Sequence, residues 1–514
     1  MAQADFDPAS VAGRSVVDLI DHWAAQRADD AFIIDPASGE TLTFAALQKA
    51  CRRFSLKLDE LDIASDASVA YALDNGFNAV RTILGTLYSG RLAVAVNLVS
   101  GQNTIAYVLQ HSDAALVFAD ERSQSLIESA LGSMAEADRP VIELVDESCF
   151  AANGSTVHQR EVDQQTAGLL MYTSGTTGVP KGVVHTHGSL IAGGCNTALA
   201  HELSLSDRGL CVLPLYHINA FCVSLMGALV SGSSLVMPDR FSVSRFWGQV
   251  RNQACTWFSV VPTHISYLVH EAEQNGHRNE GLEQLRFGRS ASAPLAPEVQ
   301  QAFEDRFGIP IIETMGLTET AAQILSNPMH GVRKIGSPGI PYGNEVIIAD
   351  DQQRECARET EGEVLVRGPN VMREYRKNPD VTAETITADG WLRTGDLGRM
   401  DADGYVFITG RLKELIIKGG ENIAPREIDE ALYAHSDVVE AAAFARDCTR
   451  YGQTVEAAVK LSDGSAVTTE ALRELCRDRI GAFKTPDRIH VLPELPKGPS
   501  GKIQRVKLVE LTQK

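Results

Sequence analysis

A short segment rich in hydroxyl groups and glycine follows an apolar run of the chain. Residues 173–181 read T-S-G-T-T-G-V-P-K and come directly after the apolar residues 169–172, which are expected to form a strand. Glycine has no Cβ, so backbone N–H groups in such a loop can converge on an anion, and a lysine adds a mobile positive charge. The segment therefore predicts a phosphate-binding loop made by Thr173, Ser174, Gly175, Thr176, Thr177, Gly178 and Lys181.

The loop differs from that of the P-loop nucleotide hydrolases. When the pattern G-x-x-x-x-G-K-[ST] starts at Gly175, Pro180 stands where the second glycine belongs, and Gly182 where a hydroxyl would bind Mg²⁺. A P-loop kinase or GTPase is therefore disfavoured. A flexible linker is the plain alternative, but a linker needs neither four clustered hydroxyls nor a lysine behind a strand.

Together with five further motifs, the loop resembles the adenylate-forming superfamily, which comprises acyl-CoA synthetases, adenylation domains of peptide synthetases, and luciferases. The segment T-S-G-T-T-G-V-P-K-G is similar to the phosphate-binding signature of that superfamily. The other motifs follow in order: LPLYH at 213–217, ETMGLTE at 313–319, TGDL at 394–397, GRLKE to KGGENI at 410–423, and PKGPSGKI at 496–503. The resemblance implies an AMP-forming acid–CoA ligase that uses ATP, Mg²⁺ and coenzyme A.

The resemblance also implies two half-reactions and assigns residues to them. A carboxylate attacks the α-phosphate of ATP and releases pyrophosphate, and a thiol then displaces AMP from the acyl-adenylate. Thr318 would bind the α-phosphate, Glu319 would bind Mg²⁺, and Lys502 would stabilise the charge that develops between carboxylate and phosphate. Lys181 and its loop would hold the β- and γ-phosphates. The remaining nucleotide contacts are assigned to Thr314, Met315, Asp396 at the ribose hydroxyls, and Arg411 as the opposing donor.

A hinge is expected at the start of the C-terminal part of the chain. Lys413 stands where the superfamily places the pivot between its two domains. Rotation there would first present Lys502 for adenylation and then bring Gly419 and Gly420 to a channel for the thiol.

Polar residues mark the expected acid pocket. His217, Asn219, Arg289 and Ser290 offer hydrogen-bond donors instead of the deep apolar cavity that a long-chain fatty acid needs. This favours a short anionic acid, with Arg289 or His217 as the partner of a second negative charge; His217 is also a catalytic candidate. The alternative is that Arg289 pairs with a carboxylate of the protein itself.

Within the superfamily, several stretches are most similar to the oxalate–CoA ligase group. They are TWFSVVPT at 256–263, RSASA at 289–293 and SNP at 326–328. The chain departs from that group at Met315, where the group has tyrosine, and at Asn219 and Ala322, where it has histidines. A thioether contact would replace aromatic stacking on adenine. Fewer donors and more space favour sulfoacetate over oxalate, and another short- or medium-chain acid is a further alternative.

Composition restricts the partners. The 514 residues include 47 Lys and Arg against 66 Asp and Glu, a formal charge of −19, which argues against nucleic acid or an anionic membrane. Residues 1–7 show no signal peptide, and no apolar stretch is long enough to span a membrane. The nine cysteines are scattered singly, which predicts reduced thiols in the cytoplasm, and His185 and His187 lack further zinc ligands.

Alternating helix and strand signals must position these residues, and they predict an α/β fold. Helices are expected at 15–26, capped by Ser15, and at 43–57, and buried strands at 114–119, 141–145 and 209–213. The turn DADG at 401–404 before YVFIT predicts a hairpin. We expect a large domain at 1–410 with parallel-rich sheets, which holds the nucleotide and acid sites. A small, mobile α+β domain at 411–514 would carry the catalytic lysine.

Two other functions stay open at this point. A ligase that loads a carrier protein is one, although no carrier domain follows in this chain, so free CoA is favoured. A nucleotide-binding protein without ligase chemistry is the other. The joint presence of Lys181, Glu319, Asp396, Arg411 and Lys502 argues against it.

Overall fold

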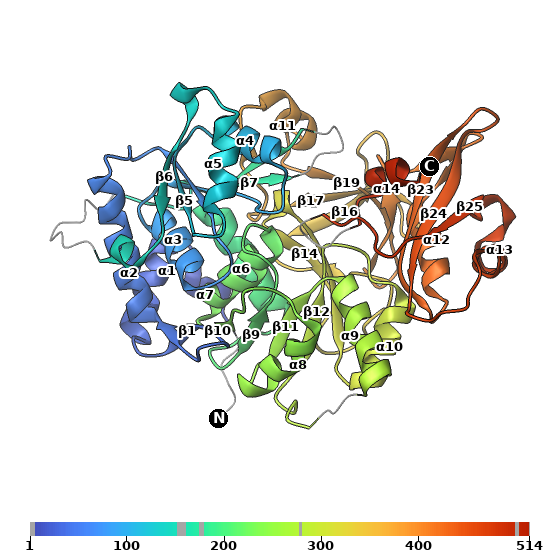
Figure 1. Ribbon diagram of the computed structural model, residues 1–514, viewed down its shortest axis with the longest axis horizontal. Helices are drawn as coiled ribbons and strands as arrows, with labels where there is room; N and C mark the ends of the chain where they lie inside the picture. The colour runs from blue at the N-terminus through green and yellow to red at the C-terminus, as the bar shows by residue number, and fades with distance from the viewer. Residues whose placement is uncertain (1–5, 152–160, 174–178, 277–279, 499–502, 513–514) are drawn as a thin grey trace.

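The computed structural model describes residues 6–151, 161–173, 179–276, 280–498 and 503–512. Two large sheets and two smaller ones, with helices packed on them, make up this part of the chain (Figure 1). The α/β prediction is confirmed. Within the described residues, no helix has the length and apolar character needed to cross a membrane.

The first large sheet has seven strands and carries the start of the expected phosphate loop. Its order is β18 (Glu374–Tyr375), β8 (Lys181–Thr186), β7 (Ala167–Thr173), β4 (Leu92–Ala95), β3 (Ser68–Ala72), β5 (Ala114–Ala119) and β6 (Val141–Leu144). The strands from β7 to β6 are parallel, and β8 and β18 are antiparallel to their neighbours. Strand β7 ends at Thr173, the first residue of the expected phosphate loop.

The second large sheet has nine strands and carries the expected acid pocket. Its order is β15 (Ile340–Pro341), β14 (Ala322–Ser326), β13 (Ile311–Leu317), β12 (Phe287–Ser290), β11 (Trp257–Val260), β9 (Arg208–Cys211), β10 (Ser234–Val236), β1 (Ala31–Ile34) and β2 (Thr41–Thr43). The strands from β13 to β1 are parallel, with antiparallel strands at both ends.

Helices cover these sheets. They are α1 (Val16–Gln26), α2 (Phe44–Glu60), α3 (Phe77–Tyr88), α4 (Gln102–His111), α5 (Gln124–Gly132), α6 (His187–Ala200), α7 (Gly227–Ser231), α8 (Val243–Asn252), α9 (Pro262–Asn275), α10 (Pro297–Phe307) and α11 (Pro379–Thr385). Most of α6 is buried, because it packs against strands of both large sheets.

The two smaller sheets follow in the second half of the chain. The four-stranded antiparallel sheet contains β16 (Glu345–Ala349), β17 (Gly362–Arg367), β19 (Leu392–Met400) and β20 (Val406–Arg411). The five-stranded sheet contains β22 (Glu421–Ile423), β21 (Ile416–Lys418), β24 (Gly452–Leu461), β23 (Val438–Cys448) and β25 (Arg488–Val491). With α12 (Pro425–Tyr433), α13 (Thr469–Lys484) and α14 (Arg505–Leu511), it lies at one end of the long axis of the molecule (Figure 1).

Local sequence signals account for several element boundaries. The Ser15 hydroxyl accepts from the Asp18 backbone N–H at 3.2 Å, and Asp18 accepts from the Ser15 N–H at 2.7 Å, so the predicted cap is a capping box. The hairpin predicted around residues 401–404 is the β19–β20 pair. The strand predicted at 141–145 exists as β6, but its predicted burial is wrong. Val141 is 59% exposed because β6 is the edge strand of its sheet.

The C-terminal part has a hydrophobic core of its own. Ile416, Ile428, Leu432, Val455 and Leu472 are among its buried members. Strand β20 ends at Arg411 in the four-stranded sheet, and the next sheet begins at Ile416 in β21. The boundary at residues 410/411 and the mobility of residues 411–514 stay predictions.

Candidate active site

Arg289 is the centre of a buried polar cluster at the carboxyl ends of parallel strands. It lies on β12 between Ser259 of β11 and Ile312 of β13 in the strand register. Its side chain donates from Nη1 to Oδ1 of Asn219 at 2.9 Å and to Oγ of Ser259 at 3.2 Å, and from Nε to Oε1 of Gln323 at 3.2 Å. Ligands of open α/β sheets bind at this edge, so the cluster lies where an acid pocket is expected.

The guanidinium of Arg289 is bonded only to neutral oxygens among the described residues. Arg289 is 1% exposed, and no described carboxylate forms a salt bridge with it. Burial lowers the pKa of Arg289 to about 9, so the group remains charged at neutral pH. A buried charge without an opposite charge is costly, and an anionic ligand would offset that cost. The alternative expectation, a carboxylate of the protein as its partner, is not met in the described part of the chain.

Asn219 links Arg289 to the segment after the LPLYH motif. Residues Asn219–Met226 form η4, a stretch of π-helix, a rare geometry that often marks functional sites. The amide of Asn219 accepts from Arg289 and Ser259 through Oδ1 and donates to Oγ of Ser292 at 3.0 Å. The amide is thus fixed in one orientation beside Arg289, and its predicted role in binding the acid stays a prediction.

The other two predicted acid-pocket residues contact the cluster less directly. His217 lies two residues before Asn219, and its carbonyl accepts from the Phe221 N–H at 2.9 Å. Ser290 follows Arg289 on β12 and is fully buried, and its carbonyl accepts from Thr314 Oγ1 at 3.4 Å. Asn219 therefore contacts Arg289 directly. His217 and Ser290 are connected to the cluster through the residues that neighbour them in the chain.

Gln323 is a member of the cluster that sequence reasoning missed. Its Oε1 accepts from Arg289 and lies 3.2 Å from Nε2 of His201, a fully buried ring. Burial and then the charge of Arg289 hold the pKa of His201 well below its usual value, so the ring is neutral and donates this bond. Because Gln323 lies on β14, far from the other members in sequence, no local pattern indicates its role.

On the nucleotide side, Lys181 and Glu319 both contact one tyrosine. Lys181 begins β8, and its Nζ lies 4.2 Å from the centre of the Tyr375 ring. The hydroxyl of Tyr375 donates to Oε1 of Glu319 at 2.7 Å. Tyr375 was not predicted, since the two-residue strand β18 gives no sequence signal. Ser174, Gly175, Thr176, Thr177 and Gly178 of the loop, and Lys502, lie outside the described residues.

A buried histidine fixes the backbone beside Glu319. His185 on β8 donates from Nε2 to the carbonyl of Thr318 at 2.6 Å, and its Nδ1 lies 3.0 Å from Oγ of Ser189. Burial lowers the pKa of His185 to about 4, so the ring is neutral with its proton on Nε2. The carbonyl of Glu319 in turn accepts from the Met372 N–H at 2.8 Å. The described residues contain no cluster of three or more side chains suited to hold a metal by themselves.

Asp396 and Arg411 face each other on neighbouring strands. They are register partners in β19 and β20, and Nε of Arg411 lies 2.5 Å from Oδ1 of Asp396. The Asp396 N–H donates to Thr394 Oγ1 at 3.0 Å. Arg411 therefore orients the carboxylate of Asp396, which is 6% exposed.

The ETMGLTE motif needs its glycine for a close approach of two strands. A Cβ on Gly316 would lie 1.8 Å from the carbonyl oxygen of Ala322 on the antiparallel strand β14. Met315 beside it is half-buried against the core of the four-stranded sheet. The close packing fixes the start of the turn that carries Thr318 and Glu319.

The residues predicted for the hinge (Lys413) and for the thiol channel (Gly419 and Gly420) lie in the C-terminal part of the chain. Burial lowers the pKa of Lys181, and the nearby charge of Lys413 lowers it further, so these two lysines are neighbours. Gly419 and Gly420 both have positive φ, 61° and 89°, in the turn between β21 and β22.

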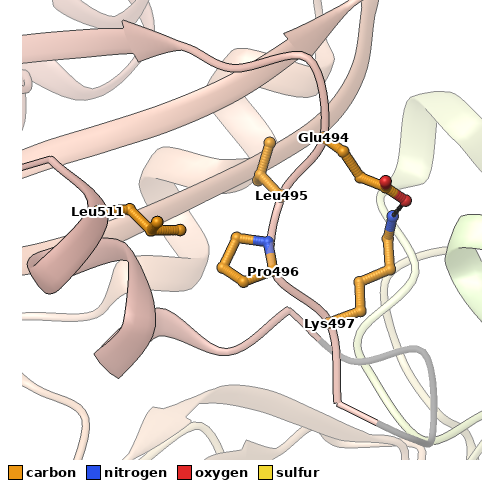
Figure 2. A pocket seen from close by; sticks show the side chains of 5 residues that line it. All are labelled: Glu494, Leu495, Pro496, Lys497 and Leu511. Carbon is orange, nitrogen blue, oxygen red and sulfur yellow. Dashed lines mark hydrogen bonds and ion pairs between the residues drawn. The ribbon is translucent and has the colours of Figure 1, made fainter.

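One cavity lies apart from these residues. It measures about 370 Å³ and is lined by Glu494, Leu495, Pro496, Lys497 and Leu511, between the segment after β25 and α14 (Figure 2). Among the predicted site residues that the structure describes, none lines it. The chemistry of the Arg289 cluster and of the Glu319 region, and not this hollow, therefore identifies the candidate site.

The chain is similar to known proteins over most of its length. The AMP-binding enzyme family model matches residues 20–376, and the model of the AMP-binding enzyme C-terminal domain matches residues 427–502. The chain is 44% identical over 497 residues to a sulfoacetate–CoA ligase of Cupriavidus necator, covering 96% of each chain. It is 33% identical over 478 residues to an oxalate–CoA ligase of Arabidopsis thaliana, covering 90% of this chain and 92% of that one.

A solved structure agrees with these relatives. The o-succinylbenzoate CoA synthetase of Bacillus subtilis in complex with ATP and a magnesium ion superposes with a TM-score of 0.83 at 28% identity. The superposition covers 95% of this chain and 98% of that one. The chain therefore belongs to the AMP-binding enzyme family and is an AMP-forming acid–CoA ligase.

Proposed function

We propose that this ligase activates a small acid with a second negative charge, with sulfoacetate as the preferred substrate. The carboxylate oxygen of the acid attacks the α-phosphorus of ATP, and pyrophosphate leaves. The sulfur of CoA then attacks the acyl carbon, and AMP leaves. The thiol proton passes to solvent or to a basic group.

The observation that carries this proposal is the uncompensated charge of Arg289. Its neighbours Asn219, Ser259 and Gln323 are neutral, and the side chain is buried. A sulfonate or carboxylate placed against Arg289 would supply the missing opposite charge, and its planar donors suit such oxygens. A monocarboxylate with an alkyl tail would leave the guanidinium without that partner.

Two features favour sulfoacetate over oxalate. The chain is more similar to the sulfoacetate–CoA ligase than to the oxalate–CoA ligase named above. Ala322, which precedes Gln323 of the cluster in β14, is small, and would leave more space for a tetrahedral sulfonate than a larger side chain there. Oxalate is the second candidate, because a planar dianion would satisfy the same guanidinium.

Magnesium and CoA complete the proposed set of cofactors and co-substrates. Mg²⁺ binds commonly through one or two carboxylates together with substrate phosphates, and Glu319 offers such a carboxylate. When bound, the ion would offset the repulsion between the acid and the phosphates. We propose Thr318 and the loop with Lys181 for the phosphates, Asp396 with Arg411 for the ribose, and Lys502 for the charge on the reacting atoms. Thr314 and Met315 would contact the nucleotide, and Lys413, Gly419 and Gly420 would serve the thiol step.

Free CoA is the proposed acceptor, in place of a carrier protein, and the cytoplasm is the proposed location. All nine cysteines are free in the structure, which suits a reducing compartment.

The test is CoA-dependent AMP formation from ATP and Mg²⁺ with a series of acids. The series contains sulfoacetate, oxalate, malonate, acetate, benzoate and octanoate. We expect the highest kcat/KM with sulfoacetate and loss of turnover in Lys502→Ala. Preference for octanoate or benzoate would contradict the charged pocket while leaving the ligase activity in place.

A further inference from the structure

Tyr375 contacts two oppositely charged groups of the nucleotide side. Its hydroxyl donates to Oε1 of Glu319 at 2.7 Å, and its ring faces the ammonium group of Lys181 at 4.2 Å. Only 3% of the tyrosine is exposed. One side chain therefore binds an anion through its hydroxyl and a cation through its π face.

The backbone around Tyr375 is fixed from three directions. Strand β18 pairs with β8, where Tyr375 is the register partner of Val183, two residues after Lys181. The Tyr375 N–H donates to Oγ1 of Thr382 at 2.9 Å. The Met372 N–H donates to the carbonyl of Glu319 at 2.8 Å. The ring is thus held in place independently of the two charged groups that it contacts.

Lys181 and Glu319 also attract each other. Burial lowers the pKa of Lys181, while the charge of Glu319 acts in the opposite direction, which shows that the two are close. Within the described residues no ion pair joins them, and each of the two charged groups contacts Tyr375 instead. A direct pair would neutralise the ammonium that the phosphates need and the carboxylate that Mg²⁺ needs.

We propose that Tyr375 is a positioning residue that keeps Lys181 and Glu319 apart, so that both charges are available when ATP and Mg²⁺ bind. The inference rests on the proposed function only in that Lys181 binds phosphate and Glu319 binds the metal. It does not depend on which acid is the substrate.

The test measures nucleotide binding by calorimetry without any acid, so that no turnover occurs. Tyr375→Phe keeps the ring and removes the hydroxyl. We expect the Mg²⁺ concentration that gives half-maximal ATP binding to rise about tenfold, while binding of ATP in EDTA stays within twofold of the unaltered protein. An unchanged Mg²⁺ dependence would overturn the proposal.

A second pair of variants tests the separation of charges directly. Tyr375→Leu removes both contacts and should weaken ATP binding in EDTA at least fivefold, because Lys181 then pairs with Glu319. Adding Glu319→Gln to Tyr375→Leu should restore that binding, since the competing carboxylate is gone. A double variant that binds metal-free ATP as weakly as Tyr375→Leu would overturn the proposal, because damage to the fold alone is not reversed by Glu319→Gln.

Two controls complete the experiment. Tyr107→Phe removes a hydroxyl for which the described residues offer no side-chain hydrogen bond, and should leave every binding constant unchanged. Lys181→Ala should weaken ATP binding in EDTA. If it does not, the phosphate role in the proposed function fails, and this failure is distinct from the outcomes for Tyr375.

Discussion

Lys497 and Glu440 form a buried ion pair of 2.7 Å in the C-terminal part of the chain, and Tyr267 of α9 joins it from the N-terminal part. The hydroxyl of Tyr267 donates to Glu440 and accepts from Nζ of Lys497 at 2.9 Å. Burial acts to lower the pKa of Lys497, but the bonds to Glu440 and Tyr267 outweigh it and raise that pKa. Lys497 also lines the hollow after β25, where Figure 2 shows its side chain reaching Glu494.

This three-residue contact joins the two parts of the chain. Tyr267→Phe removes both hydrogen bonds but leaves the ion pair intact, so we expect a loss of about 1.5–3 kcal/mol in the free energy of unfolding, the range for a bond to a charged group. Urea unfolding measures it, with Tyr107→Phe as the matched control. An unchanged midpoint would mean that the contact contributes nothing to the association of the two parts.

The pair of Asp396 and Arg411 predicts an effect on nucleotide binding. Asp396→Asn weakens the bond from Arg411 and removes the charged acceptor proposed for the ribose, so ATP binding should weaken about 10- to 100-fold, the equivalent of about 1.5–3 kcal/mol. Calorimetry with ATP measures this change. The control is Glu359→Gln, which alters an exposed ion pair with Arg399. Arg399 lies on β19, as Asp396 does, and the control should leave ATP binding unchanged. An equal loss in both variants would contradict a specific role for Asp396.

Gly316 predicts a large effect on stability. Because a Cβ there would lie 1.8 Å from the Ala322 carbonyl oxygen, Gly316→Ala must push two paired strands apart. We expect a loss of about 3 kcal/mol or more in the free energy of unfolding. Gly132→Ala in α5 meets no atom within 4 Å and should be neutral or slightly stabilising. Equal stability of the two variants would show that β13 and β14 can separate freely.

Buried neutral histidines predict acid sensitivity. Burial lowers the pKa of His185 and His187 to about 4 and that of His264 to about 3, from 6.5. Above pH 6.5 both folded and unfolded states are neutral. As the pH falls below 6.5, these histidines are protonated in the unfolded state but stay neutral in the folded state. Stability is therefore lost, by about 2 kcal/mol per histidine at pH 5.

The histidine prediction is tested by urea unfolding at several pH values. His264 stacks on Phe241 with ring centres 3.8 Å apart, so His264→Phe keeps a flat ring in place and should reduce the loss between pH 7 and pH 5. His330→Gln changes a histidine that is 82% exposed and should leave the pH dependence as it is. If the free energy of unfolding of His264→Phe falls with pH as steeply as that of the unaltered protein, the lowered pKa of His264 would be contradicted.

The elements that sequence predicted well are those that local patterns determine. Ser15 and Asp18 form a capping box within four residues, and the turn at 401–404 forms its hairpin between neighbouring segments. The burial of β6 was wrong because an edge position depends on the order of the whole sheet, to which Val141 gives no clue.

The sequence predicts the site residues that lie in recognisable motifs, but not those that come from segments distant in the chain. Arg289, Asn219 and Asp396 were singled out from their motifs, and the structure gives each of them a defined place. The neutral partner Gln323 and the tyrosine Tyr375 come from other strands, so only the folded sheets bring them to the charged groups. The roles of Ser174 to Gly178 and of Lys502 stay predictions from the motifs.

The most direct test of the charged pocket is a substrate comparison in Arg289→Met. Replacing an uncompensated buried charge by an apolar side chain of similar length is commonly tolerated, so this variant should fold. We predict that kcat/KM for sulfoacetate falls about 10²- to 10⁴-fold, the equivalent of a lost buried charge pair of about 3–5 kcal/mol. The value for propionate, which has no second charge, should stay the same or rise. Sulfoacetate turnover within threefold of the unaltered enzyme would contradict the account.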